Sequence, residues 1–289
     1  MTDLRDILNE RLIADGATGT QLLARGLAGE CPELWNVERP DVVREVCRAY
    51  VDAGSQLVCT NTFGASQWKL DRSGHAADQE RFCNAAAENA LAAADGKAYV
   101  LADIGPTGEL PEPFGAHSID EFEVVFAAQI ELLAKAGVHG VIIETMSSAD
   151  EGAAAVRAAK RACGLPVIAC MTYSAGNAGY RTMMGETVAQ AAEKLLDAGA
   201  DVVGSNCGLG IGQMAEVVGE IKAVTSGPVI AKPNAGRPRL VDGETVFEES
   251  AADWAPKVSG LVEAGANIVG GCCGTTPDHI ARACSLLNG

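Results

Sequence analysis

The amino-acid sequence predicts a single (β/α)8 barrel, the TIM-barrel architecture, on the strength of three observations. The chain has 289 residues, of which 48% are hydrophobic and 21% are charged, so it can bury a large core. Four segments repeat one pattern, in which a helix that ends at Ala-Gly precedes an apolar, β-branched run. Runs this apolar are typical of strands buried in a parallel sheet, and a single barrel of such strands reaches roughly 250 residues.

Eight short apolar segments are predicted as strands. In chain order they lie in RLIADG from Arg11, VDAGSQLVCTN from Val51, YVLADIGP from Tyr99, AKAGVHGVIIET from Ala134, PVIACMTY from Pro166, LDAGADVVGSN from Leu196, PVIAKPN from Pro228 and VEAGANIVGGCC from Val262. Helices are predicted at 41–53, 78–95, 119–136, 150–162, 186–198, 212–225 and 251–264, with a last helix from Pro277. This regular alternation of strand and helix is typical of a closed barrel.

A doubly wound open sheet is the alternative fold. Such a sheet binds dinucleotides through a G-x-G-x-x-G sequence after its first strand. The segment DGATGTQLLARG places glycines at 16, 19 and 26, which is a different spacing. The sequence therefore gives no support to a dinucleotide site.

The composition indicates one domain and excludes several classes of partner. No Gly-, Ser- or Pro-rich spacer divides the chain, so we expect one domain over residues 1–289. The N-terminus alternates charges, unlike a signal peptide, and no apolar run reaches the ~20 residues of a membrane span. We therefore expect a cytoplasmic protein without a membrane segment. The formal net charge of −16 disfavours nucleic acid as a partner.

Polar side chains stand at the carboxyl end of every predicted strand, where the active sites of barrel enzymes lie. In strand order the strands end in Asp15 and Gly16, Asn61 and Thr62, Asp103, Glu144 and Thr145, Thr172 and Tyr173, Asn206 and Cys207, Lys232 and Asn234, and Cys272 and Cys273. Three cysteines from two strands therefore share one rim. Their spacing is unlike the C-x2-C pairs of structural zinc modules, but a barrel brings these strand ends together.

The cysteines Cys207, Cys272 and Cys273 suggest a metal site. Three sulfur ligands favour zinc over magnesium or calcium and leave one tetrahedral position open for a substrate. The glycines around the adjacent pair would let both side chains turn to one ion. Two alternatives stay open: simple burial of all three, or a vicinal disulfide between the adjacent pair, which a reducing compartment disfavours. We expect ordinary burial for Cys47, Cys59, Cys83, Cys163, Cys170 and Cys284.

Six motifs resemble those of one enzyme family: DGATGTQLLARG, TNTFGAS, DIGPTGELPEPFG, NCGLG, KPNAG and GGCCGTTPDHI. Together they span residues 15–280 and are similar to the homocysteine S-methyltransferase family, most nearly to the homocysteine-binding barrel of cobalamin-dependent methionine synthases. The resemblance implies a (β/α)8 barrel whose zinc is held by Cys207, Cys272 and Cys273. It also implies that Asn234 is a weak fourth ligand when substrate is absent.

The resemblance further implies which residues contact homocysteine. The family's substrate contacts correspond to Asp15, Gly16, Thr62 and Glu144. A carboxylate at Glu144 can pair with the substrate ammonium, and backbone N–H groups after the first strand can bind its carboxylate. The alternative is structural: Asp15 would fix a turn, Thr62 would cap a helix and Glu144 would support a neighbour. Asp103 and Asn206 are expected to hold loops.

The expected activity is zinc-dependent transfer of a methyl group to the thiol of L-homocysteine, which gives methionine. Cys207, Cys272 and Cys273 are expected to take part in catalysis as metal ligands, not as covalent nucleophiles. A free thiol has a pKa near 8.5 and is mostly protonated at neutral pH. Zinc coordination would remove that limit.

The methyl donor is a separate question. The chain ends after the eighth unit and lacks the D-x-H-x-x-G sequence of cobalamin-binding domains, so we expect methylcobalamin to arrive on a separate corrinoid protein. Met183 and Met184 would either form an adaptable docking surface or pack under their loop. S-methylmethionine, a betaine and S-adenosylmethionine are the alternative donors. Other interpretations are a different thiol acceptor, a non-catalytic zinc- or thiol-binding module, and a redox enzyme that uses Cys272 and Cys273.

Overall fold

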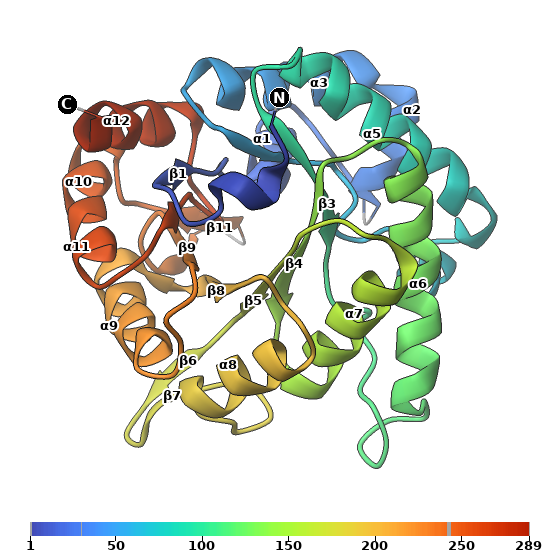
Figure 1. The fold of residues 1–289 in the computed structure, drawn as a ribbon. Helices are drawn as coiled ribbons and strands as arrows, with labels where there is room; N and C mark the ends of the chain where they lie inside the picture. The colour runs from blue at the N-terminus through green and yellow to red at the C-terminus, as the bar shows by residue number, and fades with distance from the viewer. Residues whose placement is uncertain (1, 30, 242–243, 289) are drawn as a thin grey trace.

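Eight parallel strands form one sheet in a computed structural model of the protein, which describes residues 2–29, 31–241 and 244–288 (Figure 1). These strands are β1 (Leu12–Ile13), β2 (Leu57–Cys59), β3 (Tyr99–Ile104), β4 (Gly140–Met146), β5 (Val167–Met171), β8 (Val202–Gly210), β9 (Val229–Asn234) and β12 (Ile268–Val269). The sheet order is β1-β12-β9-β8-β5-β4-β3-β2. A parallel bridge between Ala14 and Leu57 joins the two ends. The sheet therefore closes, and the predicted barrel is confirmed.

Helices surround the barrel on its outside (Figure 1). They are α1 (Thr18–Leu23), α2 (Trp35–Glu38), α3 (Pro40–Asp52), α4 (Gln67–Arg72), α5 (Gln79–Ala94), α6 (Ile119–Lys135), α7 (Ala149–Ala162), α8 (Val188–Asp197), α9 (Ile211–Lys222), α10 (Ala251–Trp254), α11 (Val258–Glu263) and α12 (Pro277–Asn288), with 3-10 helices η2 (Pro32–Leu34), η3 (Ala76–Asp78) and η4 (Ala255–Lys257). A further 3-10 helix, η1 (Leu4–Ile7), lies across one end of the barrel. The long helices agree with the predicted ranges to within a few residues. One prediction was wrong in detail: the helix at 251–264 is divided into α10, η4 and α11, because Pro256 has no N–H for the preceding turn.

Two hydrophobic layers hold the barrel together. Side chains such as Leu57 and Ile142 fill the interior, and η1 brings Leu4 into the same cluster at the end where the strands begin. A larger layer lies between the strands and the helices and includes Phe122 and Trp254, both fully buried. Burial on both faces explains why the strands read as continuous apolar runs in the sequence.

The alternation of side chains along each strand determines which polar groups reach the interior. Residues two apart on a strand point to the same face. Ile142 and Ile230 belong to the interior cluster, so Glu144 and Lys232 face inward one level nearer the carboxyl end. Asp103 on β3 also faces inward, two residues after the interior Leu101 and in register with Ile142. The apolar interior is therefore closed at the carboxyl end by a layer of charged residues.

Two hairpins that the sequence did not predict extend from loops at the carboxyl end of the barrel. They are β6 (Ser174–Gly176) with β7 (Gly179–Arg181), and β10 (Pro238–Val241) with β11 (Glu244–Phe247). A Cβ added at Gly274 would lie 2.3 Å from the Phe247 Cβ, so β11 packs directly on the chain after β12. After β7, Met183 is exposed and Met184 is half-buried.

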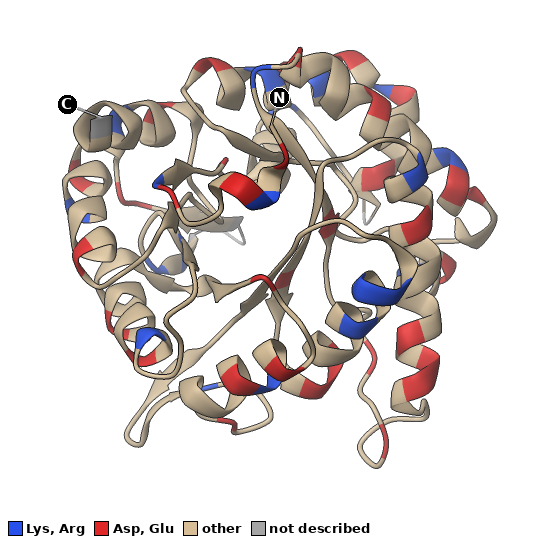
Figure 2. Ribbon diagram, in the orientation of Figure 1, with Lys and Arg blue, Asp and Glu red and all other residues tan. Residues whose placement is uncertain are grey.

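Charged side chains are spread over the outer helices, with acidic residues interspersed with basic ones (Figure 2). Several form ion pairs between helices, such as Lys194 with Asp150 at 2.7 Å. Within the described ranges, no helix is both long enough and apolar enough to cross a membrane.

Candidate metal centre and substrate cavity

Three thiols converge at the carboxyl end of the barrel. The sulfur atoms of Cys207, Cys272 and Cys273 all lie within 4.8 Å of one another, and those of Cys207 and Cys273 are 3.7 Å apart. Two sulfurs bound to one tetrahedral zinc at about 2.3 Å are separated by about 3.8 Å. The trio therefore fits a zinc ion, and the set has the soft sulfur donors that zinc prefers.

A left-handed backbone turn places Cys207. Simple alternation along β8 would turn Cys207 away from the interior, because its neighbour Asn206 faces inward. Cys207 instead has a φ of 59°, and Gly208 follows with a φ of 68°. This conformation costs a non-glycine residue about 1–3 kcal/mol. The strain is the structural reason that the thiol faces the other two.

The adjacent cysteines lie in a turn just after β12. The Thr275 N–H donates to the Cys272 carbonyl at 3.0 Å, and Gly274 has a φ of 82°, as the third residue of a type II turn requires. The Cys272 N–H also donates to the Pro233 carbonyl at 2.8 Å. The sequence predicts this pair at the end of the strand itself. Because the strand stops at Val269, a turn rather than strand geometry directs both side chains.

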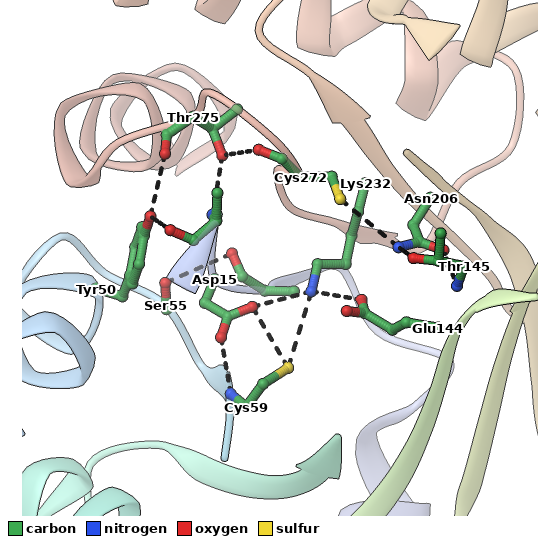
Figure 3. A network of polar contacts seen from close by, with 12 residues as sticks. Asp15, Tyr50, Ser55, Cys59, Glu144, Thr145, Asn206, Lys232, Cys272 and Thr275 are labelled. Atoms are coloured by element: carbon green, nitrogen blue, oxygen red, sulfur yellow. Dashed lines mark hydrogen bonds and ion pairs between the residues drawn. The ribbon is translucent and has the colours of Figure 1, made fainter. Parts of the chain in front are cut away.

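Asn206 supports the sulfur trio from below. Its amide oxygen accepts the Thr145 N–H at 2.7 Å, and its amide nitrogen donates to the Thr145 hydroxyl at 2.8 Å (Figure 3). The same nitrogen lies 3.7 Å from the Cys272 sulfur. Thr145 also has a positive φ, of 60°. Asn206 thus ties β4 to the three cysteines, and these contacts join two strands rather than hold a loop.

Hydrogen bonds among the three thiols shift the pKa of each one. Hydrogen bonds from the thiols of Cys272 and Cys273 lower the pKa of Cys207 to about 3. The same contacts raise the pKa of Cys272 well above its ordinary value and that of Cys273 to about 12. Without a metal, the trio therefore favours a single thiolate held by two thiols.

Asn234 is the predicted fourth metal ligand. It is buried at the end of β9, and its Oδ1 has no hydrogen-bond partner within the part of the chain that the structure describes. Hydrogen bonding from Asn234 also helps to lower the pKa of Cys207. A buried amide oxygen without a partner, on a side chain that contacts Cys207, is consistent with a neutral fourth donor.

A cavity of about 460 Å³ opens beside the thiols. Its walls come from the loop after β1, residues 31–33, the chain after β2, helix α4 and the ends of the strands. This volume is in the range of small-molecule sites. The three cysteines line it together with charged residues of the interior layer.

A buried ammonium group organises that charged layer. Lys232 Nζ lies 3.0 Å from Asp15 Oδ1 and 2.7 Å from Glu144 Oε1, and all three side chains are less than a tenth exposed (Figure 3). Burial opposes the charge of Lys232, but Asp15 and the other nearby acids raise its pKa well above the ordinary value. The lysine thus holds two carboxylates in fixed positions at the cavity wall.

The structure brings most of the predicted substrate residues together. Asp15, Gly16 and Glu144 line the cavity with the three cysteines. Thr62 does not: it is fully buried, and its hydroxyl donates to the Asp103 carbonyl at 2.8 Å. Asn234 is likewise absent from the described residues that line the cavity.

Sequence reasoning missed several cavity residues. Lys232 appeared only as a polar strand end, although a lysine inside an apolar strand is a signal of a buried ion pair. Cys59, expected to be an ordinary core residue, lines the cavity 3.8 Å from the Lys232 ammonium. Glu33 and Lys69 come from loops, whose path the sequence pattern does not reveal.

Glu33 and Lys69 also line the cavity. Burial raises the pKa of Glu33, whose Oε1 accepts the Gly64 N–H at 2.6 Å. Burial lowers the pKa of Lys69, whose ammonium lies 4.5 Å from the centre of the Phe63 ring. The cavity therefore has charged side chains from its loops as well as from the strand ends.

Comparison with known proteins identifies the family. The model of the homocysteine S-methyltransferase family matches residues 12–287. The chain belongs to the homocysteine S-methyltransferase family. The resemblance predicted from the six motifs is thus confirmed, and the family is one of enzymes.

Individual relatives agree with this assignment. The chain is 33% identical over 310 aligned positions to a methionine synthase of Mycobacterium tuberculosis and 32% identical to one of Mycobacterium leprae, with 99% of this chain covered. It spans only 25% of the length of these relatives. The metallated homocysteine methyltransferase MmuM from Escherichia coli has a TM-score of 0.79, 22% identity and 99% coverage of both chains. Its oxidised form gives the same TM-score with 23% identity and 98% coverage of both chains. At this identity the similarity to MmuM shows the barrel fold alone.

Proposed function

We propose that this family member transfers a methyl group to the thiol of L-homocysteine, with zinc as its metal, and releases methionine. The single observation that supports this most directly is the convergence of three thiols on one point beside a cavity of small-molecule size. Family membership supplies the substrate class. We further propose that the chain acts as one domain in the cytoplasm, where a reducing environment keeps these thiols available.

Cys207, Cys272 and Cys273 would hold the zinc, with Asn234 as a fourth donor that substrate replaces. When bound, zinc supplies Lewis-acid activation that lets a substrate thiol ionise at neutral pH. The left-handed turn at Cys207 and the turn after β12 keep the three sulfurs in place, so little reorganisation is needed when substrate enters.

The charged layer would orient the amino-acid part of homocysteine. Asp15 and Glu144 are fixed by Lys232. Gly16 lets the backbone lie close to Thr275, since a Cβ at this position would lie 2.7 Å from the Thr275 hydroxyl oxygen. We propose that Thr62 acts indirectly, because its hydroxyl holds the carbonyl of Asp103, which is itself a cavity residue. In the reaction, a sulfur lone pair forms the bond to the methyl carbon, and the electron pair of the broken bond stays on the donor.

We propose a methyl-corrinoid on a separate protein as the donor. Its support is the resemblance of the motifs to the barrel of cobalamin-dependent methionine synthases and the 33% identity to a methionine synthase. S-methylmethionine, a betaine and S-adenosylmethionine are the competing donors.

The test incubates the zinc-loaded protein with L-homocysteine and each donor in turn, including methylcobalamin, and measures methionine. Methionine from methylcobalamin supports the corrinoid donor, and methionine from a small sulfonium or ammonium donor overturns it. Homocysteine binding without methionine from any donor would favour a non-catalytic thiol-binding module. Reversible oxidation of Cys272 with Cys273 coupled to turnover would favour a redox enzyme.

A further inference from the structure

The ammonium group of Lys232 makes the contacts that the family resemblance assigns to the substrate. The resemblance implies that Asp15 and Glu144 contact homocysteine, and that a carboxylate at Glu144 pairs with the substrate ammonium. In the structure, Lys232 Nζ already lies between these two acids, 3.0 Å from Asp15 Oδ1 and 2.7 Å from Glu144 Oε1 (Figure 3). The chain therefore supplies its own cation to this acid pair.

Lys232 is held firmly in this position. It lies on β9 in register with Asn206 of β8, and its side chain is 3% exposed. Ile230, two residues earlier, belongs to the interior cluster, so the lysine continues the same inward-facing row. A lysine that is buried this completely has lost its hydration, and its ion pairs offset that loss. Lys232 therefore cannot leave the acid pair without a loss of stability when a ligand enters.

Contacts within the chain also occupy most of Asp15. Its Oδ1 accepts from the Lys232 ammonium at 3.0 Å and from the Cys59 thiol at 3.6 Å. Its Oδ2 accepts the Cys59 N–H at 2.7 Å. A carboxylate has about four acceptor positions, and these three contacts fill most of them. Asp15 is therefore poorly placed to bind a ligand ammonium as well.

The neighbouring acid of the same layer does not replace the lost partner. Asp103 lines the cavity, and burial and the charge of Glu144 raise the pKa of Asp103 well above its ordinary value. The neutral form of this acid is therefore favoured. A ligand ammonium near the acid pair would also meet the like charge of Lys232, which disfavours its binding there.

We propose that Lys232 takes the place of the substrate ammonium in this chain, so that the cavity binds thiol acids without an α-amino group about as well as it binds L-homocysteine. The inference rests on the proposed function, because it concerns the acceptor of that reaction. It widens the acceptor class from amino acids to mercapto acids. Methyl transfer to such an acid involves the same atoms: the thiol loses its proton, the sulfur lone pair bonds the methyl carbon, and the electron pair of the broken bond stays on the donor.

Calorimetric binding of two thiols to the zinc-loaded protein tests the proposal. L-homocysteine carries the α-ammonium group, and 4-mercaptobutanoate has the same carbon chain, thiol and carboxylate without it. A hydrogen bond between a ligand ammonium and a carboxylate is worth more than about tenfold in affinity. We expect the two dissociation constants of the wild type to differ by less than about tenfold, because Lys232 already makes these contacts.

Lys232→Met opens the acid pair to the ligand. Methionine keeps an unbranched apolar stem and removes the ammonium, so homocysteine can supply the missing cation and 4-mercaptobutanoate cannot. We expect the ratio of the two affinities to shift by more than about tenfold in favour of homocysteine. If the variant is unstable, the rise in melting temperature that each thiol causes measures the same preference, because a ligand of the folded state stabilises it.

Lys69→Met is the matched control. It removes an ammonium group from the same cavity, but that group lies 4.5 Å from the centre of the Phe63 ring rather than between Asp15 and Glu144. This replacement should leave the ratio of the two affinities at its wild-type value. Zinc content is measured for each variant, so that a lost metal is not mistaken for a changed preference.

The outcomes separate the inference from the proposed function. If the wild type binds neither thiol, the proposed function fails and the inference fails with it. If the wild type binds homocysteine more than about tenfold more tightly than 4-mercaptobutanoate, the inference is overturned and the proposed function stands. An unchanged ratio in Lys232→Met would also overturn the inference, because Lys232 would then not be in the place of the ligand ammonium.

Discussion

The sulfur atoms of Cys207 and Cys273 lie 3.7 Å apart, although 66 residues separate them in the chain. Cys207 belongs to β8, Cys273 follows β12, and β9 lies between these strands in the sheet. Their proximity is therefore a property of the closed barrel. In a small zinc module the metal itself organises the fold, whereas here the barrel brings the three sulfurs together by its own packing.

Replacement of Cys272 by alanine should abolish metal binding and activity together. Two remaining sulfurs do not make the three-ligand set that a catalytic zinc requires. Elemental analysis of the purified variant should give less than a tenth of the wild-type zinc, with methionine formation reduced in proportion. Cys83→Ala is the control, because Cys83 is fully buried in α5 and outside the site. Full turnover by metal-free Cys272→Ala would contradict a role for the metal.

Metal removal should expose the trio to oxidation. Protein whose metal has been removed with a chelator is treated with diamide. The Cys207 and Cys273 thiols should form a disulfide and pass their two hydrogen atoms to diamide, which is reduced. Peptide mapping by mass spectrometry identifies the bond, and the zinc-loaded protein should resist the same treatment. A disulfide between Cys272 and Cys273 instead would contradict this prediction and support the alternative of a vicinal disulfide.

Lys232→Met should destabilise the fold strongly. The substitution leaves Asp15 and Glu144 buried without their cation, which costs about 3–5 kcal/mol. Urea unfolding at neutral pH measures the loss. The control is Lys194→Met, which also removes a lysine paired with two acids, Asp150 and Glu186, but at a half-exposed site. That change should cost less than about 1 kcal/mol. Similar losses for both variants would show that burial is not decisive here.

The fold could be predicted from the sequence because its signals are local and repeated. Each strand is an apolar run buried on both faces, and each long helix ends near a glycine or a small residue. The hairpins β6–β7 and β10–β11 could not be predicted, since their positions depend on contacts such as that of Phe247 with Gly274. The break at Pro256 could have been read from the proline itself.

The candidate site could be predicted in part, for a physical reason. Parallel strands in a barrel place their carboxyl ends on one rim. The three cysteines could therefore be found among the strand-end residues without knowing the path of the loops. The hydrogen-bond and ion-pair partners of these side chains could not be predicted from their positions in the sequence. Only the structure shows that Lys232 pairs with Asp15, or that the Thr62 hydroxyl donates to a backbone carbonyl.

Asn206→Asp tests how the ligand set is held. Aspartate keeps an acceptor for the Thr145 N–H but loses the amide donor near Cys272 and adds a charge. Loss of such a supporting contact lowers metal affinity about 10–100-fold. A competition titration with a zinc chelator measures the change. Asn267→Asp, at the opposite end of the barrel, is the matched control and should bind zinc as the wild type does. Unchanged affinity in Asn206→Asp would show that Asn206 supports only β4.

Glu151 lies outside the cavity and gives a clean test of pH dependence. It is buried in α7, and its Oε1 accepts the N–H and the hydroxyl of Thr107, both at 2.8 Å. Burial raises the pKa of Glu151 above its ordinary value, and the bonds from Thr107 offset part of that rise. The folded protein therefore holds this proton more tightly than the unfolded chain does.

The sign of the effect follows from that difference. The stabilisation from Glu151 is present in full below the ordinary pKa and is lost as pH rises through the raised pKa of the folded state. Glu151→Gln keeps the acceptor for Thr107 and removes the titration. From about pH 5 to pH 8, the melting temperature of the variant should therefore fall less than that of the wild type, as measured by scanning calorimetry. The other buried acids are common to both proteins, so their contributions cancel in the difference. Parallel curves for the two proteins would mean that Glu151 does not change its protonation on unfolding.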